Sequence, residues 1–245
     1  MHARFVKTVW ENETRTIATL YFKPDRPYYF TAGQYADISI PHEKPDSRGM
    51  TRTMTFTSLP TDSLAAITTR LSEKNGSSYK QAIRRLKPTA QVSLTDAMGD
   101  MVLPLDSTVP LVFVAGGVGI ASFVSMIKWL TAQKDRRDVT LIYTVRDTSD
   151  IIFQDQFDVY AKIGSLTKLV FTTDNKVDGL EWKGVVHKSR LTSADIAKYL
   201  KPDSMVYISG TESMVEQLHH ELEDIYKMPQ YRIAFDFFGG YAADI

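Results

Sequence analysis

The sequence predicts a two-domain protein, in which an N-terminal antiparallel β-barrel precedes a C-terminal α/β domain built on a parallel sheet. Two rhythms along the chain lead to this fold class. Up to residue 95, short segments rich in Thr, Val, Ile, Tyr and Phe alternate with turns rich in Pro, Gly, Asp and Asn. From residue 111 onward, apolar strands alternate with helices, which is typical of a parallel sheet covered on both faces. We therefore divide the chain into residues 1–106 and 107–245.

The N-terminal domain is predicted to contain six strands and one helix. The strands are expected at residues 4–10, 14–22, 35–40, 51–58, 64–71 and 91–95. The apolar residues of the helix recur at helical spacing, namely Tyr79, Ala82, Ile83 and Leu86. Either Ser77 or Ser78 can cap the N-terminus of this helix, and Pro88 ends the segment.

The C-terminal domain is predicted to alternate four strands with four helices. The strands are expected at residues 111–116, 139–145, 166–173 and 205–209, and the helices at 122–133, 153–161, 192–200 and 212–226. Two of the helix starts have the spacing of a capping box, which pairs Thr192 with Asp195 and Ser209 with Glu212.

Composition excludes several classes of function. The chain has 29 Lys and Arg residues and 29 Asp and Glu residues, so it lacks the basic surplus of a nucleic-acid-binding protein. With no cysteine, it can form no disulfide, thiolate zinc site, cysteine nucleophile or cysteine-ligated iron–sulfur cluster. Residues 111–130 are apolar, but their glycines and Lys128 favour a strand followed by a helix over a membrane span. We expect a cytoplasmic protein that does not cross a membrane.

No metal site is predicted. The adjacent His219 and His220 lie on a polar helix, where neighbouring side chains face different directions and cannot form an i, i+4 ligand pair. His187 stands alone between Val186 and Lys188, which favours a structural role.

A glycine-rich turn joins the strand at 111–116 to the next helix, with the sequence AGGVGIAS at residues 115–122. Glycines at such a turn let backbone N–H groups approach a phosphate, and the helix N-terminus adds partial positive charge. As a dinucleotide fingerprint the turn is incomplete, because Ser122 stands where the third glycine is expected. The pattern favours nucleotide binding at Gly116, Gly117, Val118 and Gly119 over a turn that binds nothing.

The end of the next strand carries Arg146 and Asp147, in the region that the adenosine ribose of a bound dinucleotide would reach. Arg146 suits a 2′-phosphate and Asp147 a free 2′-hydroxyl, so the sequence leaves the cofactor open with a slight preference for the phosphorylated form. An exposed ion pair at the strand end is the alternative interpretation.

Seven segments in chain order carry a resemblance to a known family: Phe30-x-x-Gly33-Gln34-Tyr35, Arg52-x-Met54-Thr55, Gly76-Ser77-Ser78, Asp96–Asp100 with Leu103-Pro104, Gly116-Gly117-Val118-Gly119-Ile120, Tyr207-Ile208-Ser209-Gly210-x-x-Ser213-Met214, and Phe237-Phe238-Gly239-Gly240-Tyr241. Together they resemble the ferredoxin–NADP⁺ reductase-like family of flavoproteins over nearly the whole chain. The sequence departs from the family pattern at Met54, at Ala121 and Ser122, and at Ser209, where an aromatic residue, Thr-Pro and a cysteine are usual.

The resemblance implies an FAD site in the barrel and an NAD(P)H site in the α/β domain. Its flavin-contacting positions are Arg52, Thr53, Met54, Thr55, Gly76, Ser77 and Ser78, with Arg52 on the phosphates and the Thr55 hydroxyl near flavin N5. Its nicotinamide-nucleotide positions are Gly116, Gly117, Val118, Gly119, Arg146, Gly210 and Met214. The resemblance also puts Ser209 near the nicotinamide, and Phe238, with Tyr241 second, is expected to stack on the flavin. Thr55, Ser209 and Phe238 are the expected catalytic positions.

The function implied by the resemblance is an NAD(P)H-dependent flavin reductase, with NADPH slightly favoured over NADH. Hydride would pass from the nicotinamide to FAD N5, and electrons would leave for an external acceptor such as ferredoxin or flavodoxin. Two alternatives stay open. One is a reductase of free flavin, ferric chelates or quinones, and the other is a non-catalytic electron-transfer subunit that needs a partner, which the substitutions at Ala121 and Ser209 suggest.

Overall fold

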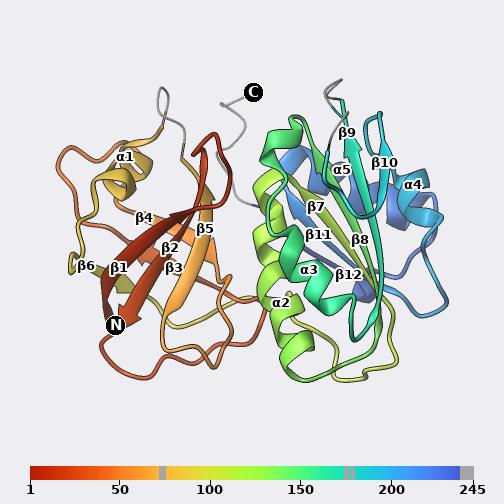
Figure 1. Ribbon diagram of the computed structural model, residues 1–245, viewed down its shortest axis with the longest axis horizontal. Coiled ribbons are helices and arrows are strands. Elements are labelled where there is room, and N and C mark those ends of the chain that lie inside the picture. The colour runs from red at the N-terminus through yellow and green to blue at the C-terminus, as the bar shows by residue number, and fades with distance from the viewer. Residues whose placement is uncertain (72–75, 174–176, 178–179, 238–245) are drawn as a thin grey trace.

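A computed structural model describes residues 1–71, 76–173, 177 and 180–237 of the chain. Figure 1 shows two bodies side by side, an N-terminal antiparallel sheet and a C-terminal α/β layer structure, with helix α2 (Ala121–Ala132) between them. This is the two-domain fold class that the sequence predicts. Among the described residues, no helix combines the length and the apolar character needed to cross a bilayer.

The N-terminal sheet has six strands: β1 His2–Trp10, β2 Ile17–Pro24, β3 Tyr35–Ser39, β4 Thr51–Thr55, β5 Ala65–Arg70 and β6 Gln91–Leu94. Their order is β4-β3-β6-β1-β2-β5, and each neighbouring pair is antiparallel. A bridge between Phe56 and Ile67 links the chain after β4 to β5, and Thr57 N donates to Ala66 O at 2.8 Å. The two edges of the sheet therefore meet, and the sheet closes into a barrel.

One helix, α1 (Ser78–Arg85), packs on the barrel. Ser77 is its N-cap and accepts a hydrogen bond from Lys80 N at 3.3 Å, which settles the choice between the two serines. Tyr79 and Ile83 are the buried residues of the predicted apolar stripe, and they join the barrel core.

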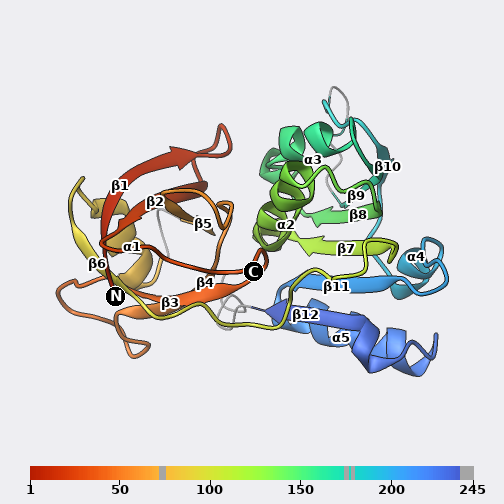
Figure 2. The ribbon, with the colours of Figure 1, turned by 90° about the horizontal axis from the view of Figure 1, so that it is seen from below.

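The C-terminal sheet also has six strands: β7 Leu111–Gly116, β8 Asp138–Val145, β9 Ser165–Thr172, β10 Val185–His187, β11 Met205–Gly210 and β12 Ile233–Phe237. Their order is β10-β9-β8-β7-β11-β12, with every pairing parallel. Along β7, Val112 and Val114 face one core and Phe113 and Ala115 the other, so both faces of the sheet are covered. Helices α2 and α3 (Gln154–Tyr160) cover one face, and α4 (Ser193–Ala197) and α5 (Glu212–Asp224) the other (Figure 2).

The structure corrects the predicted elements at two places. Strands β10 and β12 were not among those expected, because β10 has three residues and β12 has an acid in an apolar run. The capping box at Thr192 and Asp195 is confirmed, whereas the one expected at Ser209 and Glu212 is wrong. Strand β11 continues through Gly210, so Thr211 becomes the N-cap of α5 and makes no side-chain cap.

Helix α2 connects the two domains. Its Ser125 hydroxyl accepts a hydrogen bond from Gly33 N of the barrel at 3.0 Å, and its Lys128 Nζ donates to Thr57 O at 2.8 Å. Burial lowers the pKa of Lys128 despite the opposing charges of Asp62 and Glu11. These contacts hold the end of β4 beside the carboxyl edge of the parallel sheet.

Candidate functional site

The glycine turn follows β7 and forms a short 3-10 helix, η1 (Gly117–Ile120), that leads into α2. Gly117 has a φ of +52°, and a Cβ at this position would meet no atom within 4 Å, so open space lies over its backbone. Gly119 is the opposite case, because a Cβ would lie 2.3 Å from the carbonyl oxygen of Ser209. The turn therefore packs tightly against β11 and leaves Gly117 exposed toward open space.

The predicted nucleotide residues of β11 and α5 lie beside this turn. A Cβ on Gly116 would come within 2.7 Å of the Met214 methyl group, and one on Gly210 within 2.5 Å of the same atom. The Met214 side chain thus covers two glycines at the carboxyl ends of neighbouring strands. The structure brings Gly116, Gly117, Val118, Gly119, Gly210 and Met214 together at one edge of the sheet.

Ser209 lies under the turn. Its side chain is fully buried, and its hydroxyl is 3.1 Å from the hydroxyl of Ser122, which is also fully buried. Ser122, which stands where a third glycine is expected, therefore links α2 to β11 through this hydrogen bond. The backbone carbonyl of Ser209 packs against Gly119 of the turn, whereas its hydroxyl faces Ser122 of α2.

Thr55 meets a residue of the other domain. Its hydroxyl donates a hydrogen bond of 3.3 Å to Asp236 Oδ2, so the end of β4 contacts β12, which points toward the barrel in Figure 2. Asp236 is paired in register with Ser209 on the neighbouring strand. Burial raises the pKa of Asp236 to about 6, against the opposing hydrogen bonds from Thr55 and the Phe237 backbone. The carboxyl group can therefore hold or release a proton near neutral pH.

Asp236 was not among the residues predicted from the sequence. Its signal was available, because it is the lone acid in the apolar run of residues 233–238. An acid in such a run is expected to be solvated on an edge strand or to be buried for a chemical reason. The sequence alone does not show that β12 pairs with β11, and this pairing is what brings Asp236 to the edge of the sheet beside Thr55.

The other residues of β4 alternate between the two faces of the strand. Met54 is 8% exposed and belongs to the barrel core, whereas the Thr53 hydroxyl points outward and donates to Asp37 Oδ1 at 2.6 Å. Arg52 lies on the same face as Met54 and is held by its own loop. Thr55, at the end of the strand, makes a hydrogen bond to the other domain, through Asp236.

Arg52 and the N-terminus of α1 converge on one carboxylate, that of Asp46. Arg52 Nη2 donates to Asp46 Oδ1 at 3.1 Å, and Ser78 N donates to Asp46 Oδ2 at 3.0 Å. Desolvation opposes ionisation of Asp46, but hydrogen bonds from Arg48 and Ser78 and the charge of Arg52 outweigh it and lower its pKa. The two predicted phosphate-binding elements are thus adjacent and already bind an anionic group. Asp46 is the second residue that the sequence reasoning missed.

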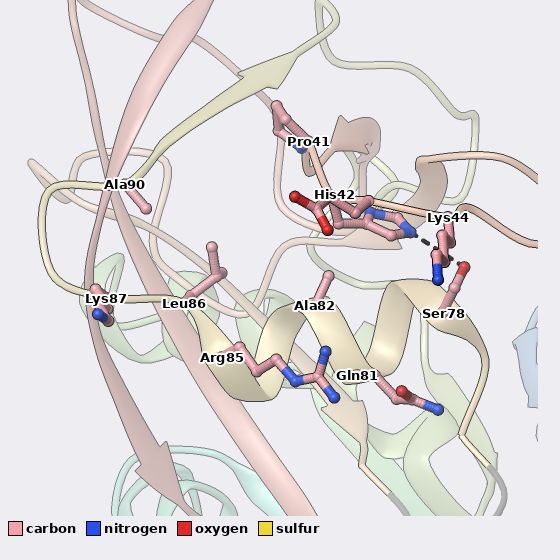
Figure 3. Close-up of a pocket in the computed structure, with 11 residues that line it drawn as sticks. Pro41, His42, Lys44, Ser78, Gln81, Ala82, Arg85, Leu86, Lys87 and Ala90 are labelled. Atoms are coloured by element: carbon pink, nitrogen blue, oxygen red, sulfur yellow. Dashed lines mark hydrogen bonds between the residues drawn. The ribbon is translucent and has the colours of Figure 1, made fainter.

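A cavity of about 620 Å³ lies between α1 and the segment of residues 41–44, and Ser78 lines it (Figure 3). His42 Nε2 lies 3.1 Å from the Ser78 hydroxyl, and Lys44 and Arg85 line the wall. The basic side chains give the cavity a positive potential, which suits an anionic or nucleotide ligand.

At the end of β8, Arg146 and Asp147 are both exposed. The Asp147 carboxylate accepts a hydrogen bond from Ser149 N at 2.9 Å and so caps the short helix η2 (Thr148–Asp150). Phe238 and Tyr241 lie outside the described residues.

His219 and His220 differ from the expectation that they point apart. Their ring centroids are 5.4 Å apart. One ring nitrogen of each histidine and a carboxylate oxygen of Glu223 all lie within 4.8 Å of one another. The His219 ring also lies 4.5 Å from the Phe235 ring, centroid to centroid, in a tilted arrangement. The absence of a metal site stays a prediction.

Comparison with known proteins agrees with this geometry. Residues 113–220 match the family described as oxidoreductase NAD-binding domain. Flavohemoprotein A of Dictyostelium discoideum is 25% identical over 242 residues, which cover 93% of this chain and 58% of that protein. The phenol 2-monooxygenase reductase component DmpP of Pseudomonas sp. is 29% identical over 176 residues, covering 70% of this chain and 48% of that protein.

Among solved structures, a ferredoxin–NADP⁺ reductase from Neisseria gonorrhoeae with bound FAD and NADP has a TM-score of 0.74 and 19% identity, and the match covers 97% of this chain and 98% of that one. This likeness establishes the fold. The chain spans between 40% and 60% of the length of the first curated relatives that it matches.

Proposed function

We propose that this chain is an NAD(P)H-dependent flavin reductase, because residues 113–220 match the oxidoreductase NAD-binding domain family and the chain has the fold of a ferredoxin–NADP⁺ reductase. Electrons would pass from NAD(P)H to FAD and then to an external acceptor. The observation that carries the proposal is the Thr55–Asp236 contact, which joins the barrel strand β4 to the carboxyl edge of the nucleotide-binding sheet. In parallel α/β sheets, ligands bind at this edge.

The barrel residues suit an FAD diphosphate. The Asp46 carboxylate occupies the place of an anion, and its hydrogen bonds from Arg52 and the Ser78 amide indicate that these donors can bind a negatively charged group. Gly76 and Ser77 precede the same helix and would extend the contact, while Thr53 and Met54 complete the predicted set. We assign the basic cavity beside Ser78 to the adenosine part of the cofactor.

The α/β residues suit a nicotinamide dinucleotide. Gly117 presents an open backbone at the start of η1, which is where a pyrophosphate would bind. Because the Asp147 carboxylate is engaged in capping η2, we propose that the exposed Arg146 dominates recognition at the ribose and favours the 2′-phosphate of NADPH.

The mechanism places three side chains at the junction of the domains. Bound FAD supplies the hydride-accepting and electron-carrying chemistry. The Thr55 hydroxyl would lie at the flavin edge, and the Asp236 carboxyl, with a pKa near 6, would hold a proton and exchange it through Thr55. Ser209 would position the glycine turn through its contact with Ser122, so that a nicotinamide bound at the turn would face the barrel.

Acceptor specificity is tested by steady-state oxidation of NADPH and NADH by the FAD-loaded protein with a panel of acceptors. We expect rapid turnover with a one-electron protein acceptor such as a ferredoxin or flavodoxin. Faster turnover with free flavin, ferric chelates or quinones would favour the alternative reductase. No turnover with any acceptor, together with flavin reduction by dithionite alone, would favour an electron-transfer subunit.

A further inference from the structure

The phosphate receptor of the barrel holds an anion that the chain itself supplies. The Asp46 carboxylate accepts hydrogen bonds from Arg52 Nη2 at 3.1 Å, from Arg48 N at 3.0 Å and from Ser78 N at 3.0 Å. One donor is a guanidinium, and another is the first amide of α1. Proteins use the same two kinds of donor to bind phosphate, so a carboxylate there competes with a phosphate for them.

Arg52 is engaged by its own loop on its other nitrogen as well. Its Nη1 donates to the carbonyl oxygens of Arg48, Gly49 and Thr51 at 2.8, 3.1 and 2.7 Å. Its guanidinium also lies 5.1 Å from the centre of the Tyr79 ring, and the side chain is only 11% exposed. A phosphate that approaches Arg52 and Ser78 therefore meets the Asp46 carboxylate on the donors that it needs.

The Asp46 side chain is free to leave. It is 31% exposed, so rotation into water would not bury an unpaired charge. The segment that carries it lies between β3 and β4 and is fixed to α1 through Ser78, whose hydroxyl accepts from Asp46 N at 2.9 Å and contacts His42 (Figure 3). The backbone of the segment can thus stay on α1 while the carboxylate moves away.

We propose that Asp46 determines flavin specificity as an internal substitute for the cofactor phosphate. A flavin that carries phosphate binds by displacing the carboxylate from Arg52 and Ser78, whereas riboflavin leaves it in place. The identity of the ligand rests on the proposed function, but the competition itself concerns any diphosphate that reaches these donors.

The test is calorimetric titration of the 245-residue chain with inorganic pyrophosphate, FAD and riboflavin. Asp46→Ala and the near-isosteric Asp46→Asn are compared with the wild-type chain. Asp106→Asn is the matched control, because Asp106 accepts from Thr108 N at 2.8 Å in the same i to i+2 turn, far from α1 in the sequence. Thermal unfolding of each variant shows that the fold is intact.

We expect both Asp46 variants to bind pyrophosphate and FAD about tenfold more tightly than wild type, since a competing charge on the shared donors has been removed. Riboflavin affinity and the control variant should be unchanged. Equal or weaker pyrophosphate and FAD binding in the Asp46 variants would overturn the inference, because Asp46 would then only position Arg52. If the variants gain pyrophosphate affinity but no chain binds FAD, the competition stands and the proposed function fails.

Discussion

At the scale of single residues, the proposed chemistry uses the Asp236 carboxyl group, whose pKa burial raises to about 6. Asp236 lies between the barrel and the parallel sheet, with the Thr55 hydroxyl as its partner. Burial stabilises the neutral acid because a carboxylate loses its hydration there. The folded state therefore binds a proton more tightly than the unfolded chain does.

This shift predicts a pH-dependent stability with a definite sign. Because the folded pKa of Asp236 is about 6 and the ordinary value is 3.8, its contribution is present at low pH and is lost as pH rises through 6. Asp236→Asn should remove this loss, so that the variant is more stable than wild type at pH 8 by on the order of 2 kcal/mol. Urea unfolding between pH 4 and pH 8 measures it.

Asp195 serves as a comparison, because its pKa is shifted in the opposite direction to that of Asp236. Desolvation opposes ionisation of Asp195, but hydrogen bonds from Lys198 and Thr192 lower its pKa, so its contribution is lost as pH falls. Asp195→Asn should therefore be less stable than wild type at neutral pH. If Asp236→Asn behaves in the same way, the raised pKa of Asp236 is wrong.

Cofactor choice also belongs to the residue scale. Arg146→Ala should lower kcat/KM for NADPH by roughly 10- to 100-fold, the value of a charge-assisted bond to the 2′-phosphate, and change that for NADH little. Arg136→Ala is the control, since Arg136 is an exposed arginine just before the opposite end of β8. An equal effect on both nucleotides would mean that Arg146 does not contact the 2′-phosphate.

At the scale of elements, the glycine turn fixes how β7, η1 and α2 meet β11. The hydroxyls of Ser122 and Ser209 and the close approach of Gly119 to the Ser209 carbonyl hold these elements together. Their tight packing leaves Gly117 with open space over its backbone. The turn thus combines a tightly packed base with an open backbone at Gly117, where we propose that a phosphate of the nucleotide binds.

Gly119→Ala tests this packing. Its Cβ would lie 2.3 Å from backbone, which cannot move as a side chain can, so the free energy of unfolding should fall by about 1–3 kcal/mol. Gly117→Ala is the comparison, because its Cβ would meet nothing within 4 Å and only its φ of +52° is unfavourable. A Gly119→Ala variant as stable as wild type in urea unfolding would show that the turn is not packed in this way.

Most elements could be predicted because each has a strong local pattern. The apolar run of β7 and the stripe of α1 are visible in the sequence alone. Strand β12 was missed because Asp236 interrupts its apolar run and because its pairing with β11 is a long-range contact. The cap at Ser209 was wrong because burial and the Ser122 hydroxyl decide its environment, and sequence spacing carries no information on either.

The residues of the candidate site likewise fall into those that the sequence could predict and those that it could not. The glycine positions could be predicted because turns need particular residues, and the structure places them at one edge of the sheet. Asp46 and Asp236 could not, because each acts through a partner distant in the sequence, Ser78 for one and Thr55 for the other. Side chains that meet across loops or domains need the fold before their chemistry can be assigned.

At the scale of the whole molecule, the proposed electron transfer requires the two domains to keep a fixed relative position. Arg70 of the barrel and Asp150 of the α/β domain form a bidentate pair, with hydrogen bonds of 2.6 and 3.2 Å. A double-mutant cycle of Arg70→Ala and Asp150→Ala should give a coupling energy of about 1 kcal/mol that weakens at high salt. The Arg232–Asp203 pair lies within one domain, and Asp203 is 74% exposed, so its coupling should be near zero. Equal coupling in the two pairs would contradict a specific domain contact.

The central claim is that this chain transfers electrons from a nicotinamide nucleotide to FAD. Its most direct test is anaerobic titration of the FAD-reconstituted protein with NADPH and then NADH, following the visible absorption of the flavin. We predict a yellow protein whose flavin is bleached by NADPH in a 1:1 ratio, because one hydride carries the two electrons that one FAD accepts. A protein that stays colourless after reconstitution, or a bound flavin that only dithionite reduces, would contradict the account.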